Sequence, residues 1–128
     1  MDGVKRVFER PLHILFVDDN SVNLLIAQKM IQKFGGIVTT ARSGTECISL
    51  VKTNTYDVVL MDIEMPDLTG LEVARELRKL NYANPIIALS ANGYLEDVRE
   101  SMAAGMNDHL QKPFTAETLF NKILEFVK

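Results

Sequence analysis

LHILFVDDNS, residues 12–21, passes from a run of apolar residues to two adjacent carboxylates, Asp18 and Asp19. The apolar part has the length and composition of a buried strand. Two carboxylates about 4 Å apart repel each other by roughly 4 kcal/mol at an effective dielectric of about 20. This is a sizeable part of a domain's usual stability of about 5–15 kcal/mol. We therefore expect a cation to offset the repulsion where this strand ends.

The same pattern recurs along the chain: five short apolar runs alternate with five longer amphipathic stretches. The short runs have the length of strands, and the apolar residues of the longer stretches lie near helical spacing. The predicted strands are 12–17, 37–41, 57–62, 85–90 and 108–112, and the predicted helices are 21–34, 43–52, 69–80, 94–104 and 115–127. The tetrapeptides SGTE (43–46) and TGLE (69–72) are capping-box signatures. Strict alternation predicts a parallel sheet covered by helices on both faces. The fold class is α/β: a single doubly wound (βα)5 domain of the flavodoxin-like type, with strand order 2-1-3-4-5.

Composition excludes several classes of protein. The chain has 128 residues, of which 47% are hydrophobic, enough for one compact domain. We expect residues 12–128 to form it and residues 1–11 to be a flexible lead-in or linker. A formal charge of -3 argues against direct binding to nucleic acid, and no apolar run suits membrane insertion or export. Cys47 is the only cysteine, which excludes an internal disulfide and suits the cytoplasm.

Polar residues stand at the ends of the predicted strands. Asp18 and Asp19 follow the first strand, Asp62 ends the third, Ser90 the fourth and Lys112 the fifth. In such sheets the functional crevice lies at the carboxyl ends of the strands, where the strand order reverses. Carboxylate oxygens suit Mg²⁺, while a lysine and a hydroxyl can contact a phosphoryl group. A carboxylate can also act as nucleophile in phosphoryl transfer, so these residues together suit phosphorylation of an aspartate beside a metal.

The segments VDDN, DVVLMDIEMPDLTG, PIIALSAN and GMNDHLQKPF stand in an order and spacing that resembles the receiver domain of two-component response regulators, from about residue 12 to 127. The resemblance implies that Asp62 is the phosphoacceptor, that Ser90 and Lys112 act on the phosphoryl group, and that Asp18, Asp19, Asp62 and the backbone carbonyl of Glu64 bind Mg²⁺ or Mn²⁺. It also implies a cis peptide bond before Pro113.

The resemblance further implies a switch and a partner. Ser90 would move toward the phosphate and His109, at a position more often Tyr or Phe, would turn inward. The surface of the fourth helix, fifth strand and fifth helix would then change its partners. The phosphodonor would be a sensor histidine kinase or a histidine phosphotransfer protein. The chain would catalyse its own phosphorylation and dephosphorylation without being a conventional enzyme. VDDN with Asn23 and GMNDHLQKP is similar to receivers of hybrid kinases, and a free-standing regulator fits equally well.

Two other functions, an aspartate-dependent phosphatase and a flavin-binding module, fit the sequence less well. A phosphatase with an aspartate nucleophile typically carries Asp-x-Asp, a triplet that does not occur here. A flavin-binding module of the same fold class would have a Ser-, Thr- and Gly-rich phosphate loop after the first strand. DDNSVN is instead acidic and would repel a phosphate in the absence of a metal.

Overall fold

The computed structural model describes residues 7–65, 67–91 and 95–127. The described elements alternate along the chain: β1 (His13–Val17), α1 (Ser21–Lys33), β2 (Ile37–Ala41), α2 (Gly44–Thr53), β3 (Val58–Asp62), α3 (Gly70–Lys79), β4 (Ile86–Ser90), α4 (Leu95–Ala103), β5 (Asp108–Gln111) and α5 (Ala116–Phe126). The strands form one parallel sheet of order β2-β1-β3-β4-β5. The predicted fold class and strand order are therefore confirmed. No helix among the described residues is long and apolar enough to cross a membrane.

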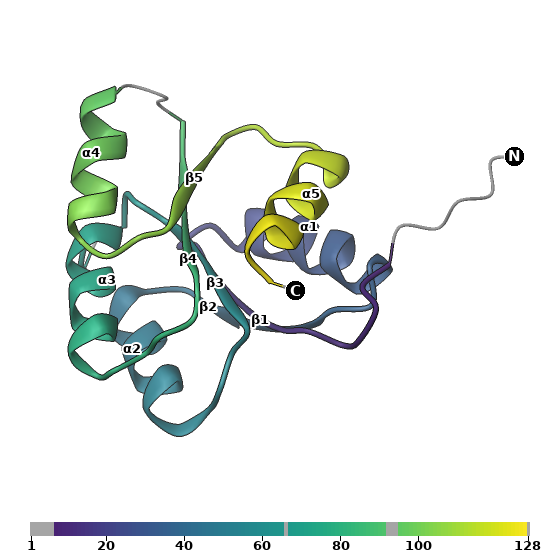
Figure 1. Cartoon of the computed structure of the whole chain (residues 1–128), viewed down its shortest axis with the longest axis horizontal. Coiled ribbons are helices and arrows are strands. Elements are labelled where there is room, and N and C mark those ends of the chain that lie inside the picture. Colours follow the sequence, from purple (N-terminus) through teal and green to yellow (C-terminus); the bar gives the residue numbers. More distant parts are fainter. Residues whose placement is uncertain (1–6, 66, 92–94, 128) are drawn as a thin grey trace, which may run out of the picture.

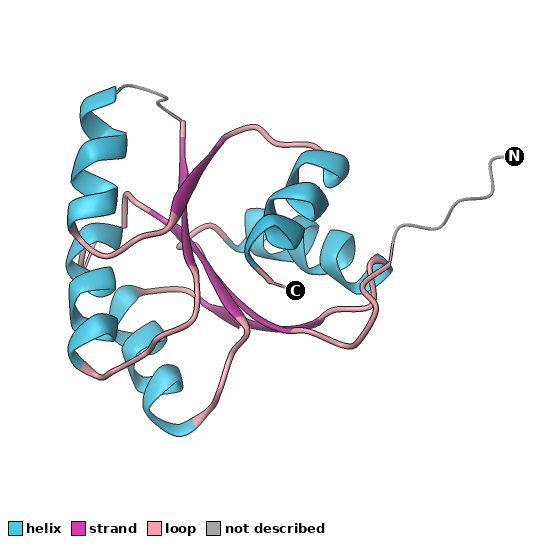
Figure 2. Ribbon diagram, in the orientation of Figure 1, coloured by secondary structure: helices cyan, strands magenta, loops and turns pink. Residues whose placement is uncertain are grey.

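The helices cover both faces of the sheet. α1 and α5 lie on one face, and α2, α3 and α4 lie on the other (Figures 1 and 2). Successive strand side chains point to opposite faces, so each strand contributes to two cores. In β1, Ile14 and Phe16 belong to the core under α1 and α5, whereas Leu15 and Val17 belong to the other. Burial on both faces explains why the strands are continuous apolar runs.

Side-chain caps fix the first residues of α2 and α3. Thr69 and Glu72 form the predicted capping box of α3. At α2, Ser43 accepts a hydrogen bond from the backbone N–H of Glu46, but the Glu46 carboxylate accepts from the N–H of Arg42 instead of closing the box. The prediction of a helix start there is confirmed, and only half of the predicted box forms.

The segment before β1 is packed against the domain from Phe8 onward. Phe8 is buried, with ring centroids 6.0 Å from Phe34 and 5.3 Å from Phe120, and its N–H donates to the carbonyl of Phe34. Arg10 pairs with Asp57 at 3.4 Å. The core thus extends into the segment that was expected to be a flexible lead-in. The sequence did not predict this packing, because one aromatic residue within a charged run gives no periodic signal. Residues 1–6 of that lead-in, Pro66, and Tyr94 at the expected start of the fourth helix lie outside the described residues.

Candidate functional site

The central strands bring three predicted carboxylates together. Val17 of β1 lies opposite Met61 of β3, and Asp18 and Asp62 are the next residues of each strand. One carboxylate oxygen from each of Asp18, Asp19 and Asp62 lies within 4.8 Å of the other two. Asp18 and Asp62 are buried and Asp19 is exposed, so the cluster opens to solvent on one side. It stands at the carboxyl edge of the sheet between β1 and β3, as predicted.

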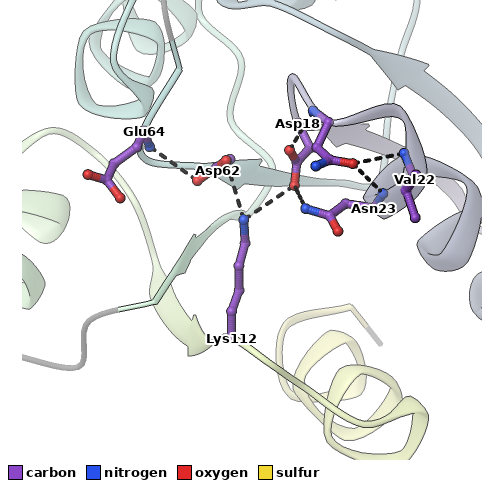
Figure 3. Close-up of polar contacts among 7 residues, drawn as sticks. Asp18, Val22, Asn23, Asp62, Glu64 and Lys112 are labelled. Atoms are coloured by element: carbon purple, nitrogen blue, oxygen red, sulfur yellow. Dashed lines mark hydrogen bonds and ion pairs between the residues drawn. The ribbon is translucent and has the colours of Figure 1, made fainter.

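Lys112 is the cation that offsets the carboxylate repulsion. Its Nζ lies 3.3 Å from Asp18 Oδ2 and 3.3 Å from Asp62 Oδ2, bridging the two side chains (Figure 3). The backbone N–H of Lys112 donates to the carbonyl of Ser90, which ties the end of β5 to the end of β4. The peptide bond between Lys112 and Pro113 is cis, as the resemblance implied.

Two asparagines hold Asp18 in place. The backbone N–H of Asn20 donates to Asp18 Oδ1 at 2.9 Å, and the Asn23 side chain donates to Asp18 Oδ2 at 3.3 Å (Figure 3). Asn20 also caps α1 by accepting from the N–H groups of Val22 and Asn23. Neither asparagine was among the predicted site residues. A signal in the sequence could have identified them: Asn20 stands directly before a predicted helix, where Asn is a favoured cap, and Asn23 lies in the first turn of that helix.

Asp62 is a buried, partly desolvated carboxyl group. Burial raises the pKa of its carboxyl above the ordinary value, and the positive charge of Lys112 opposes this shift without cancelling it. Asp62 Oδ1 accepts a hydrogen bond of 3.1 Å from the N–H of Glu64 (Figure 3). The Glu64 side chain is exposed and points away from Asp62 in the same view. The segment after Asp62 therefore supports the site through its backbone.

The two predicted switch residues, Ser90 and His109, lie at different distances from the carboxyl edge of the sheet. Ser90 is buried at the end of β4, next to the strand that carries Asp62. His109 pairs in register with Ala88, two residues before Ser90, and so lies below the carboxyl edge. Its Nε2 atom is buried and has no hydrogen-bond partner among the residues that the structure describes. His109 thus does not join the cluster formed by the aspartates and Lys112.

The donor set suits a hard divalent cation. Three carboxylates converge on one point, and oxygen ligands of this type are those that Mg²⁺ and Mn²⁺ prefer. Lys112 holds a single positive charge between two of these carboxylates. The same geometry disfavours direct binding of a phosphate by the first loop, because that loop presents carboxylates to it.

Comparison with known proteins agrees with this geometry. The model of the response regulator receiver domain matches residues 14–124. The chain belongs to this family. The receiver domain is 39% identical over 119 residues to the aerobic respiration control sensor protein ArcB of Escherichia coli, a match that covers 90% of this chain. The chain spans only 15% of the length of ArcB.

Solved structures of other receivers share the architecture. The receiver domain of the sensor histidine kinase PA1611 from Pseudomonas aeruginosa PAO1 superimposes with a TM-score of 0.81 at 35% identity, over 91% of this chain and 97% of that one. That structure contains a magnesium ion in the active-site cleft. The receiver domain of Ssk1 from Saccharomyces cerevisiae, crystallised with the histidine phosphotransfer protein Ypd1, gives a TM-score of 0.87 at 27% identity, over 92% and 90% of the two chains. This chain is accordingly a signalling receiver of the two-component and phosphorelay type.

Proposed function

We propose that this receiver domain accepts a phosphoryl group on Asp62 from a phosphohistidine of a sensor histidine kinase or a histidine phosphotransfer protein, in a reaction that requires Mg²⁺ or Mn²⁺. The observation that carries the proposal is the position of Asp62, a buried carboxylate beside Lys112 and two further carboxylates. The chain would catalyse its own phosphorylation and dephosphorylation, and would not be a conventional enzyme.

The transfer is a displacement at phosphorus. An oxygen of Asp62 attacks, the new O–P bond forms as the N–P bond of the donor breaks, and the departing imidazole keeps the electron pair and takes up a proton. Bound by Asp18, Asp19, Asp62 and the carbonyl of Glu64, the metal ion would neutralise charge on the phosphoryl oxygens. Lys112 already lies 3.3 Å from Asp62 and can pair with a phosphoryl oxygen. Water attack on the same phosphorus returns Asp62 and releases phosphate.

The outcome of phosphorylation would be a change at α4, β5 and α5. Ser90 would move toward the phosphoryl group and His109 would turn inward. Nε2 of His109 is already buried and has no hydrogen-bond partner among the described residues, so part of this ring lies inside the domain before any such change. A rearrangement that gave Nε2 a partner would remove the free-energy cost of this unsatisfied atom.

The donor would dock on α1. Val22, Leu25 and Ile26 are exposed apolar residues on this helix. A groove between α1 and residues 112–114 has Ile26, Met30 and Phe114 in its apolar part and Asp18 and Lys112 at its polar end. A donor must bring its histidine to Asp62, so the apolar surface bordering that position is the one it would cover. The Ypd1 complex with the Ssk1 receiver shows that a protein of this class meets a domain of this fold.

Phosphorylation from a small donor tests the proposal directly. With Mg²⁺ and acetyl phosphate, intact-mass measurement should show the addition of one phosphoryl group to the wild type. Asp62→Asn should abolish the addition, because the amide is a poor nucleophile. Asp57→Asn is the matched control: it makes the same change just before the start of β3, at the opposite end of the strand, and should leave the addition intact. A wild-type chain that neither gains this mass nor binds Mg²⁺ would refute the proposal.

A further inference from the structure

The segment that follows Asp62 is tied to α2 by one side chain. The Asp67 carboxylate accepts hydrogen bonds from the backbone N–H of Gly44 at 3.2 Å, from the N–H of Thr45 at 3.0 Å, and from the Thr45 hydroxyl at 2.8 Å. Gly44 and Thr45 are the first two residues of α2, whose free N–H groups face out of the helix end. Asp67 thus joins two elements that are more than twenty residues apart in sequence.

Asp67 is bound there as an anion. The hydrogen bonds from Thr45, and the further ones from Leu68 and Gly44, hold the pKa of this carboxyl well below its usual range, although the side chain is exposed. The positive end of the helix dipole favours a negative charge at the same place. α2 already has its own cap, because Ser43 accepts from the N–H of Glu46. What Asp67 adds beyond a helix cap is therefore the link between the start of α2 and the segment that follows Asp62.

This link fixes the far end of the segment that carries Glu64. At the near end, the N–H of Glu64 binds Asp62, and the N–H of Gly70 donates to the carbonyl of Ile63 at 2.7 Å. Leu68 packs on Gly44 so closely that a Cβ added there would lie 3.0 Å from the Leu68 Cβ. Residues 63–65, 67 and 68 are thereby held between β3 and α2, and Glu64 stands three residues before Asp67.

We propose that Asp67 is a positioning residue for the metal site: by anchoring to α2 the described residues that follow Asp62, it holds the main-chain carbonyl of Glu64 in place as a metal ligand. This inference rests on the proposed function. It assigns to Asp67 a role in metal affinity that a helix cap alone would not have. Loss of the anchor would leave the carboxylates in place and release the fourth ligand.

A matched pair of variants separates the two roles. Asp67→Ala and Ser43→Ala each remove one side-chain acceptor from the same helix end, but only the first frees the segment after Asp62. Mg²⁺ affinity is measured from the rise in melting temperature with Mg²⁺ concentration. Asp67→Ala should weaken the affinity by about tenfold, the lower end of the effect of outer partners of metal ligands. Ser43→Ala should stay within about twofold of the wild type, and Asp67→Asn, which keeps one acceptor oxygen, should fall between them.

A second readout needs no metal. Amide hydrogen exchange at Glu64 and Met65 in metal-free protein should accelerate in Asp67→Ala and remain at the wild-type rate in Ser43→Ala. Equal Mg²⁺ affinities and equal exchange in the two variants would overturn the role of Asp67 while leaving the proposed function intact. A wild type that binds no Mg²⁺ would overturn both proposals.

Discussion

At the residue scale, the first aspartate of VDDN is stabilised by a lysine almost a hundred residues further along the chain. Lys112 is the shared partner of Asp18 and Asp62, and its side chain is 24% exposed. A cation in this position stabilises the two carboxylates and also occupies the space between two of the proposed metal ligands. We therefore expect Lys112 to oppose metal binding while it supports phosphoryl transfer.

Lys112→Met tests this dual role. Without metal, the free energy of unfolding should fall by about 1–3 kcal/mol, less than the roughly 3–5 kcal/mol of a fully buried pair because Lys112 is partly exposed. Mg²⁺ should bind more tightly than in the wild type, and phosphorylation by acetyl phosphate should be slower. Urea unfolding with and without Mg²⁺ measures the first two effects.

Lys122→Met is the control for Lys112→Met, because Lys122 is 20% exposed and pairs with Asp108 at 2.8 Å away from the carboxylate cluster. Its Mg²⁺ response should match that of the wild type. If Lys112→Met bound Mg²⁺ more weakly than the wild type, Lys112 would not compete with the metal.

At the element scale, the start of α3 is set by how closely it approaches the end of β3. Gly70 is the first residue of α3, and a Cβ there would lie 2.6 Å from the carbonyl oxygen of Asp62 and 2.8 Å from the Cα of Ile63. Both contacts are with backbone, which cannot rotate away as a side chain can. The absence of a side chain at Gly70 thus lets the helix abut the strand that carries Asp62.

Gly70→Ala should force these two elements apart. Overpacking of this kind costs about 1–3 kcal/mol, and the better helix propensity of alanine returns at most about 1 kcal/mol. We expect a net loss of unfolding free energy in urea and slower phosphorylation at Asp62, since the shift begins at that residue's own carbonyl. An unfolding free energy equal to or above the wild type's would show that the contact relaxes at no cost.

At the scale of the whole molecule, the site and the proposed docking surface lie on neighbouring elements. The carboxylates stand at the edge of the sheet, and α1 covers the sheet face shared with α5 (Figure 1). α4, which belongs to the proposed output surface, lies on the opposite face. A donor on α1 would therefore leave α4 uncovered during transfer, whereas α5 lies on the same face as the donor.

Leu25→Ala tests the docking surface. Leu25 is 52% exposed on α1, so truncation should leave stability within about 0.5 kcal/mol, as is usual for surface substitutions. The rate of transfer from a phosphorylated histidine phosphotransfer protein, measured at limiting concentrations, should fall about tenfold, corresponding to roughly 1.4 kcal/mol at one contact residue. Phosphorylation by acetyl phosphate should not change.

Leu80→Ala is the matched control, an equally large exposed leucine at the end of α3. It should leave both rates unchanged. Equal transfer rates for Leu25→Ala and Leu80→Ala would place the donor elsewhere on the surface.

The sequence by itself determined the fold class, the strand order and the convergence of Asp18, Asp62 and Lys112. Periodicity reports which side of a strand or helix is buried, and parallel strands bring their carboxyl ends to one edge whatever the details of the loops. Five alternating units therefore sufficed to predict where the polar residues would meet.

Only the tertiary structure decided the contacts of Phe8 and Asp67. Phe8 packs on rings from α5 and from the end of α1, and Asp67 binds the start of α2. Such pairings have no periodic signature, because they depend on where two elements happen to approach each other in space. The sequence thus specified the carboxylates of the site, and the packing of loops against helix ends specified how firmly they are held.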